Sequence, residues 1–183
     1  MGHPRRLRKK YSTPKHPWQK DRIIQENKLV KEFGLKNKRE IWIAKALLSK
    51  YLRIAKTLIG LSKEERLEKE KVLLNKLEKY GLIKKNAKLD DVLSITVRDV
   101  LSRRLQTIVW KKGLASTPRQ ARQFITHGHI ALNGQKVTSP GRLITIDEEK
   151  MIDWRKSPIV VTQKQLSAEG LEKKEENVEA KGE

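Results

Sequence analysis

A helix predicted over residues 117–127 divides its side chains into an apolar face and a polar face. At about 100° per residue, Ala121, Phe124 and Ile125 fall on one side. The opposite side carries two guanidinium groups and an amide. Guanidinium groups form forked hydrogen bonds with phosphate oxygens and can stack on bases, so this face has the chemistry of RNA binding. Its members are Arg119, Arg122, Gln123 and Thr126.

Both ends of this helix carry residues that begin or end helices. Thr117 is a good N-cap, Pro118 fits the first helical position, and Gln120 completes a capping-box pattern. The helix is predicted to run to His127 and to stop at Gly128, since glycine adopts the left-handed conformation that ends helices. Local signals alone therefore position the arginine face.

The neighbouring residues predict the elements that support this helix. Residues 97–112 form a second helix, ending at Gly113. Residues 129–137 form a hairpin around Asn133-Gly134, because both central positions of a type I′ turn need positive φ. Residues 143–146 and 151–154 are two further strand candidates. We expect a helix pair over a small sheet, with basic groups on one edge.

Further polar side chains of this region could join the RNA contact. They are Arg103, Arg104, Lys111, Lys112, His127, His129, Asn133 and Lys136. Arg103 and Arg104 could instead balance the charge of Asp99 on the same helix. His127 and His129 flank a glycine and could suggest a metal pair, but no third ligand is in view, so we predict polar residues of a turn and no metal site.

An acidic cluster follows the hairpin. Asp147, Glu148 and Glu149 are adjacent, and two carboxylates could act as acid and base. No pocket-forming sequence surrounds them, so we predict a solvated turn, no catalytic residue and no enzyme activity.

The chain carries a net charge of +20 over 183 residues, and this charge is unevenly distributed. Residues 1–60 contain 17 Lys and Arg against 4 Asp and Glu, whereas residues 155–183 contain 6 of each. The positive charges of such a chain repel one another, and a bound polyanion relieves this repulsion. RNA is such a polyanion, and its binding is favoured because lysine and arginine side chains release the counterions condensed on its phosphates. The amino-terminal third should supply most of the electrostatic attraction.

Residues 1–18 are predicted to form an extended basic arm, because Pro4, Pro14 and Pro17 prevent a long helix. It could be a solvated tail or a segment that orders on RNA phosphates. Tyr11 and Trp18 favour the second interpretation, since aromatic residues are unusual in a solvated tail. The predicted contacts of the arm and of the residues after the first helix are Arg5, Arg6, Arg8, Lys9, Lys10, Lys15, Trp18, Lys38 and Arg39.

Four helices are predicted before the RNA-binding region, over residues 21–33, 37–60, 62–80 and 89–93. In the third, Ser62 and Glu65 have capping-box spacing, and its nearly balanced charge indicates scaffold or a surface that faces protein. The predicted fold class is α+β and mainly helical. The predicted divisions are 1–35 (arm and first helix), 36–98 (helical domain), 99–156 (RNA-binding module) and 157–183 (a low-complexity, disordered tail).

The composition excludes several classes of function. The chain has no cysteine, which removes disulfides, thiol nucleophiles and cysteine-ligated zinc. The basic amino terminus has no apolar stretch behind it, and no run of about 18 apolar residues exists, so no secretory signal or membrane span is expected. We predict no cofactor, no small-molecule substrate and a cytoplasmic location.

The pattern of residues 102–154 resembles the RNA-binding module named after ribosomal protein S4. The residues that carry this resemblance are Leu105, Gly113-Leu114-Ala115, Arg119-Gln120-Ala121-Arg122-Gln123, Ile125, His127-Gly128-His129-Ile130, Asn133-Gly134 and Pro140. Residues 11–18, 34–40 and 101–106 resemble the archaeal and eukaryotic branch of that ribosomal protein, with the archaeal type fitting the length better. The resemblance covers most of residues 2–155.

This resemblance implies a structural protein of the small ribosomal subunit, resident in the ribosome. It implies early binding to small-subunit rRNA of the 16S type and contact with ribosomal protein S5. It also implies a place near the decoding region and the mRNA entrance, with mRNA as a further partner. Some bacterial members hold zinc through cysteines, a feature that this chain lacks.

Three alternative functions stay open at this point. The module also occurs in RNA-modifying enzymes, but only about 100 residues precede it here, and they predict helices rather than a catalytic α/β domain. A free-standing RNA chaperone or stress factor acting on ribosomal subunits is the second alternative. DNA binding is the third, and the chain shows neither helix-turn-helix spacing nor a dimer seam.

Overall fold

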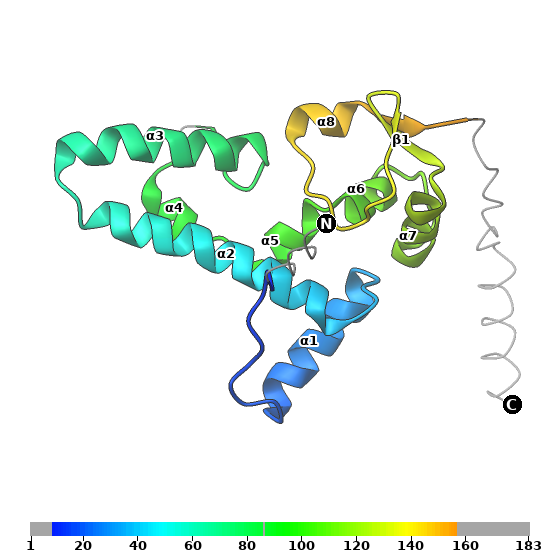
Figure 1. The fold of residues 1–183 in the computed structure, drawn as a ribbon, viewed down its shortest axis with the longest axis horizontal. Helices are drawn as coiled ribbons and strands as arrows, with labels where there is room; N and C mark the ends of the chain where they lie inside the picture. Colours follow the sequence, from blue (N-terminus) through cyan, green and yellow to red (C-terminus); the bar gives the residue numbers. More distant parts are fainter. Residues whose placement is uncertain (1–8, 86, 157–183) are drawn as a thin grey trace, which may run out of the picture.

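A computed structural model describes residues 9–85 and 87–156 of the chain. Its amino-terminal part is built on helix α2 (Lys38–Ile59), which contacts α1 (Lys20–Glu32), α3 (Lys63–Lys79), α4 (Leu89–Leu93) and α5 (Val97–Ser102). Helix α3 folds back along α2, whereas α1 lies near the other end of α2 (Figure 1). The predicted helices 21–33, 37–60, 62–80 and 89–93 are confirmed to within two residues at each end.

The apolar spacing in α2 buries one face of this helix. Ala44, Leu48, Tyr51, Ala55 and Leu58 are buried, as residues three or four apart on a helix share a face. They join side chains from α3, α4 and α5 in a first hydrophobic core, which extends along the chain to Leu101. Burial beside Tyr80 raises the pKa of Tyr51.

The predicted capping box at the start of α3 is wrong. Ser62 is the N-cap residue, but its side chain makes no capping hydrogen bond. The Glu65 carboxylate instead accepts a hydrogen bond from Lys69 Nζ at 3.3 Å, an i,i+4 pair on the exposed surface.

The single helix predicted over residues 97–112 is two helices, α5 and α6 (Leu105–Lys111). Arg104 has extended backbone with ψ of 145°, which breaks the helix. The chain around Pro140–Leu143 supplies the replacement hydrogen bonds, because Leu105 N donates to Arg142 O at 2.8 Å and Gln106 N donates to Pro140 O at 3.3 Å. The break is caused by this tertiary contact, and no proline or glycine marks it in the sequence.

The carboxyl-terminal part of the described chain combines α6 and α7 (Pro118–His127) with a three-stranded antiparallel sheet. Strand β1 (Ile130–Leu132) lies between β2 (Gln135–Lys136) and β3 (Ile152–Trp154). The turn between β1 and β2 has φ of 51° at Asn133 and 75° at Gly134, as predicted for a type I′ hairpin. The predicted α+β, mainly helical fold with a small sheet is confirmed.

A second hydrophobic core fills this part. It joins α6, α7 and the sheet through Leu105, Ile108, Ile125, Ile130 and other buried side chains, and it begins where the first core ends. The S4-like helix pair therefore has a core of its own, separate from that around α2.

Two predictions after the hairpin are wrong. The strand predicted over residues 143–146 is one isolated bridge between Leu143 and Arg104. The acidic cluster does not form a solvated turn but lies in helix α8 (Ile146–Lys150). Thr145 and Glu148 close a capping box there, and hydrogen bonds from Thr145 and Arg142 outweigh partial burial and lower the pKa of Glu148.

Candidate nucleic-acid interface

Helix α7 presents the polar face that its sequence predicts. Thr117 Oγ1 accepts a hydrogen bond from Gln120 N at 3.2 Å, and Pro118 occupies the first turn. The other half of the predicted capping box differs, because Gln120 Oε1 accepts from Ser116 N at 2.8 Å. Gly128 ends the helix with φ of 77°. The predicted apolar face, Ala121, Phe124 and Ile125, is buried.

Most of the predicted contacts of the module are exposed on α7, the hairpin and the end of α6. At the carboxyl end of α7, the rings of His127 and His129 are 6.2 Å apart, and the Lys136 side chain lies across Gly128. Arg119 forms no ion pair with any carboxylate in residues 9–85 and 87–156. The exposed set is Lys111, Lys112, Arg119, Gln123, His127, His129, Asn133 and Lys136.

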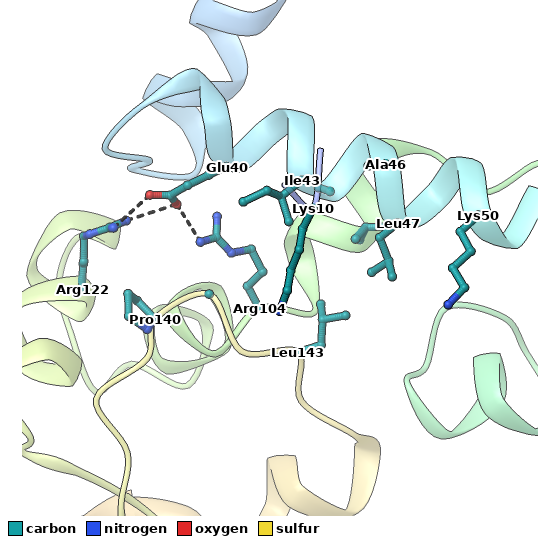
Figure 2. A pocket seen from close by; sticks show the side chains of 13 residues that line it. Lys10, Glu40, Ile43, Ala46, Leu47, Lys50, Arg104, Arg122, Pro140 and Leu143 are labelled. Carbon is teal, nitrogen blue, oxygen red and sulfur yellow. Dashed lines mark hydrogen bonds and ion pairs between the residues drawn. The ribbon is translucent and has the colours of Figure 1, made fainter. Parts of the chain in front are cut away.

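Arg122 and Arg104 are engaged with a carboxylate from the amino-terminal part. Glu40, in the first turn of α2, lies between them (Figure 2). Its Oε2 accepts from Arg104 Nη2 at 2.6 Å, and its Oε1 pairs with Arg122 Nη2 at 2.9 Å. Arg104 is only 7% exposed. We call this trio the Glu40 clamp, and it joins α2 to α7 and to the break between α5 and α6.

The electrostatics of the clamp favour the charged form of Glu40. Burial alone raises the pKa of a carboxyl group, because it disfavours the ion. The hydrogen bonds and positive charges of Arg122 and Arg104 outweigh this effect and hold the pKa of Glu40 below its ordinary value. Glu40 is therefore ionised at neutral pH, and its single negative charge is shared between two guanidinium groups.

Arg103 is also paired, but with a partner other than the one considered from sequence. Its Nη1 lies 2.8 Å from Glu149 Oε2, and its Nη2 donates to Ile144 O at 3.4 Å. The alternative that Arg103 and Arg104 balance Asp99 is wrong, since the Asp99 side chain accepts from Thr96 at the start of α5. Both arginines tie distant segments together.

A buried amide strengthens the junction between the two parts. Gln106 Nε2 lies within hydrogen-bonding distance of Gly34 O at 3.0 Å and Pro118 O at 2.9 Å. Its Oε1 accepts from Arg122 Nη1 at 3.3 Å. The amide therefore connects the loop after α1, the start of α7 and the Glu40 clamp. Sequence reasoning missed Glu40 and Gln106, whose partners lie up to 82 residues away.

Gly34 should tolerate no side chain at this junction. Its φ is 59°, and an added Cβ would lie 2.7 Å from Pro118 Cβ. Gly34→Ala should therefore lower the free energy of unfolding by more than the roughly 1–2 kcal/mol that a left-handed residue costs, as measured by urea denaturation. Gly113→Ala is the matched control, because its φ is 76° with nothing within 4 Å. Equal losses in the two variants would contradict the close approach.

A cavity of about 610 Å³ opens beside the clamp (Figure 2). Ile43, Leu47 and Leu143 supply much of its apolar wall, and Lys10 and Lys50 bring positive charge to it. This cavity places an arm residue, Lys10, next to the junction. The predicted arm contact therefore lies close to the module in space.

The described part of the arm packs against α1 and α2. Tyr11 packs near Trp42, with ring centroids 6.0 Å apart, and Lys9 Nζ lies 4.8 Å from the centre of the Tyr11 ring. Lys9, Lys10, Lys15, Trp18 and Arg39 are exposed, whereas Lys38 is half-buried, 3.8 Å from Glu26 Oε2. The predicted contacts Arg5, Arg6 and Arg8, and the predicted disordered tail over 157–183, lie outside the described residues.

Two further findings concern metals and membranes. Across the part of the chain that the structure describes, no three His, Cys, Asp or Glu side chains are grouped as metal ligands. None of the described helices has the length and apolar character needed to cross a membrane.

Comparisons with known proteins identify the family. Residues 103–150 match the S4 domain family. The small ribosomal subunit protein uS4 of Ignicoccus hospitalis is 57% identical over 154 residues, which cover 84% of this chain and 93% of that protein. The uS4 proteins of Saccharolobus solfataricus and Methanosphaera stadtmanae are 55% and 49% identical, covering 84% of this chain and 86% and 85% of theirs. The predicted S4 resemblance of the archaeal type is thereby confirmed, and the chain belongs to the family of the small ribosomal subunit protein uS4.

Proposed function

We propose that this chain is a structural, rRNA-binding constituent of the small ribosomal subunit. The observation that carries this proposal is the extent of the match, which covers 93% of the Ignicoccus hospitalis protein rather than the S4 domain alone. An RNA-modifying enzyme that uses the S4 module for binding would share only that module. The match therefore extends over the helical part that precedes the module.

Binding uses two groups of cations in a fixed relation. The first group lies on α7, the hairpin and the end of α6, and the second lies on the arm and the start of α2. The Glu40 clamp and Gln106 join the elements that carry them. Linking two modest sites raises affinity through effective concentration, and a rigid link avoids the entropic cost of ordering them.

The residues predicted as RNA contacts divide into two roles under this proposal. The exposed ones bind phosphates and accessible bases, since RNA helices present little sequence information in their deep major groove. Arg104 and Arg122 act mainly by holding the module against the helical part, because Glu40 already engages them. Arg103 pairs with Glu149 and holds α8 in place within the module.

The finer assignments follow from membership of the family. We infer that the chain binds 16S-type rRNA early in assembly, contacts ribosomal protein S5 and helps to shape the decoding region and the mRNA entrance. Its place of action is then the cytoplasmic ribosome, and its role is architectural rather than catalytic.

Competition binding tests the proposal. The full chain is mixed with a labelled small-subunit rRNA fragment and challenged with an arbitrary polyanion of equal charge. We expect the rRNA fragment to win by a large factor at 150 mM salt, because shape adds to the electrostatic attraction. Equal affinity for the two polyanions would contradict specific rRNA binding.

A further inference from the structure

A second, smaller cavity lies between the arm and the first two helices. Its volume is about 350 Å³, and its walls include the rings of Trp18 and Trp42 and the side chains of Pro14 and Pro17. Trp18 is 90% exposed, an unusual state for the largest apolar side chain. The cavity therefore has an accessible aromatic surface at its edge.

A hydrogen-bond network fixes the position of this surface. Arg22 Nη2 donates to His16 O at 3.0 Å and Pro17 O at 2.8 Å, which ties the turn before Trp18 to helix α1. Arg22 Nη1 donates to Glu26 Oε1 at 2.8 Å, and Trp42 Nε1 donates to the same oxygen at 3.1 Å. The turn, α1 and α2 are thus joined at one carboxylate.

The other oxygen of that carboxylate has no hydrogen-bond partner. Glu26 lines the cavity and is only 7% exposed, and its Oε2 is buried without a donor among the described residues. Lys38 Nζ lies 3.8 Å from it, too far for a hydrogen bond. A buried carboxylate oxygen without a donor is costly, so a ligand that supplies an N–H group would be favoured here.

The surroundings select a negatively charged ligand. Lys9, Lys15 and Arg39 are exposed on the same segments, and the Arg39 guanidinium lies 5.7 Å from the centre of the Tyr11 ring. A ligand with a negatively charged phosphate backbone and a flat ring that carries N–H donors matches all of these features. Unpaired nucleotides bind in this way, with the base stacked on an aromatic side chain and its edge hydrogen-bonded.

We propose that this cavity binds one unpaired nucleotide of rRNA, with the base stacked on Trp18 and an amino group of the base donating to Glu26 Oε2. This inference rests on the proposed function and adds a base-selective site to a surface otherwise suited to phosphates. A carboxylate oxygen only accepts hydrogen bonds, so the site favours a base edge that presents an N–H donor, such as the amino group of adenine, cytosine or guanine, over an edge that presents only acceptors.

The first experiment compares full-length variants in binding to the small-subunit rRNA fragment. Trp18→Ala should weaken binding by roughly five- to a hundredfold, the range seen when a stacked aromatic is removed. Trp18→Phe should retain most of the affinity, because a smaller ring still stacks. Val72→Ala is the matched control, since Val72 is 71% exposed on α3, away from the cavity, and should bind like wild type. Wild-type affinity for Trp18→Ala would overturn the proposal.

Chemical probing then locates the base. At least one unpaired nucleotide should be protected by the wild-type chain and reactive in the Trp18→Ala complex, with the rest of the footprint unchanged. Replacing that base with an analogue that lacks the amino group should weaken wild-type binding about tenfold and leave Trp18→Ala unaffected. Identical footprints for both chains would refute the nucleotide site while leaving the proposed function intact, whereas a wild-type chain without any footprint would refute both.

Discussion

Replacing Glu40 with alanine should lower the free energy of unfolding by about 3–5 kcal/mol, the usual effect of removing one partner from a buried ion pair. Arg104 would be left nine-tenths buried beside Arg122 with no carboxylate between them. Urea denaturation followed by circular dichroism measures this loss. The rRNA affinity should fall as well, because α7 would no longer be held against α2.

Lys69→Ala is the control for this variant. It also removes one partner of an ion pair, but both side chains of the Lys69–Glu65 pair are more than half exposed. Such pairs contribute no more than about 1 kcal/mol. If Glu40→Ala and Lys69→Ala lost equal stability, the Glu40 clamp would not hold the two parts together.

The contribution of Glu40 should also depend on pH. Its pKa is lower in the folded chain than the ordinary value of 4.5, so its stabilising effect is complete above the unfolded pKa and is lost as the pH falls through the folded one. The stability difference between wild type and Glu40→Gln should therefore shrink below about pH 4.5. A difference that widened on acidification would contradict this assignment.

Reversing two exposed cations, Arg119→Glu with Lys136→Glu, should weaken rRNA binding at least roughly tenfold and leave the fold unchanged. Neither side chain forms an ion pair among the described residues, so stability should be unaffected. The slope of log affinity against log salt should fall by about 1.5, since each phosphate contact contributes roughly 0.7–0.9. Titrations at several salt concentrations measure both quantities.

The matched control has the same charge change at a different place. Lys71→Glu with Lys76→Glu alters two exposed lysines of α3, the helix with nearly balanced charge. Its effect on affinity should be much smaller, because these residues lie away from the proposed interface. Similar losses in both double variants would show that only the net charge matters.

Local signals predicted α7 well. The cap at Thr117, the proline after it and the glycine at 128 all act within a few residues, and the buried face follows from helical spacing. The hairpin could be predicted equally well, because the Asn133-Gly134 turn depends only on the conformational preferences of two residues. Helix α8 could have been found from the capping-box spacing of Thr145 and Glu148, a signal hidden by the interpretation of the acidic run as a turn.

The junction could not be predicted in the same way. The break at Arg104 depends on hydrogen bonds that Leu105 and Gln106 donate to the carbonyl groups of residues 140 and 142, and no local residue type marks it. Arg122 was correctly placed opposite the core of α7, but its partner Glu40 lies 82 residues earlier. A helical wheel shows which side chains leave the core, and only the tertiary structure shows which of them meet a carboxylate and which face solvent.

The most direct test of a resident structural role is whether the chain stays with small ribosomal subunits through a high-salt wash. Tagged wild-type chain is assembled into subunits, which are washed and sedimented beside subunits that carry Arg119→Glu with Lys136→Glu. We expect wild type to sediment with the small subunit after the wash and the variant to be depleted. Complete release of the wild-type chain into the supernatant would contradict a resident structural role.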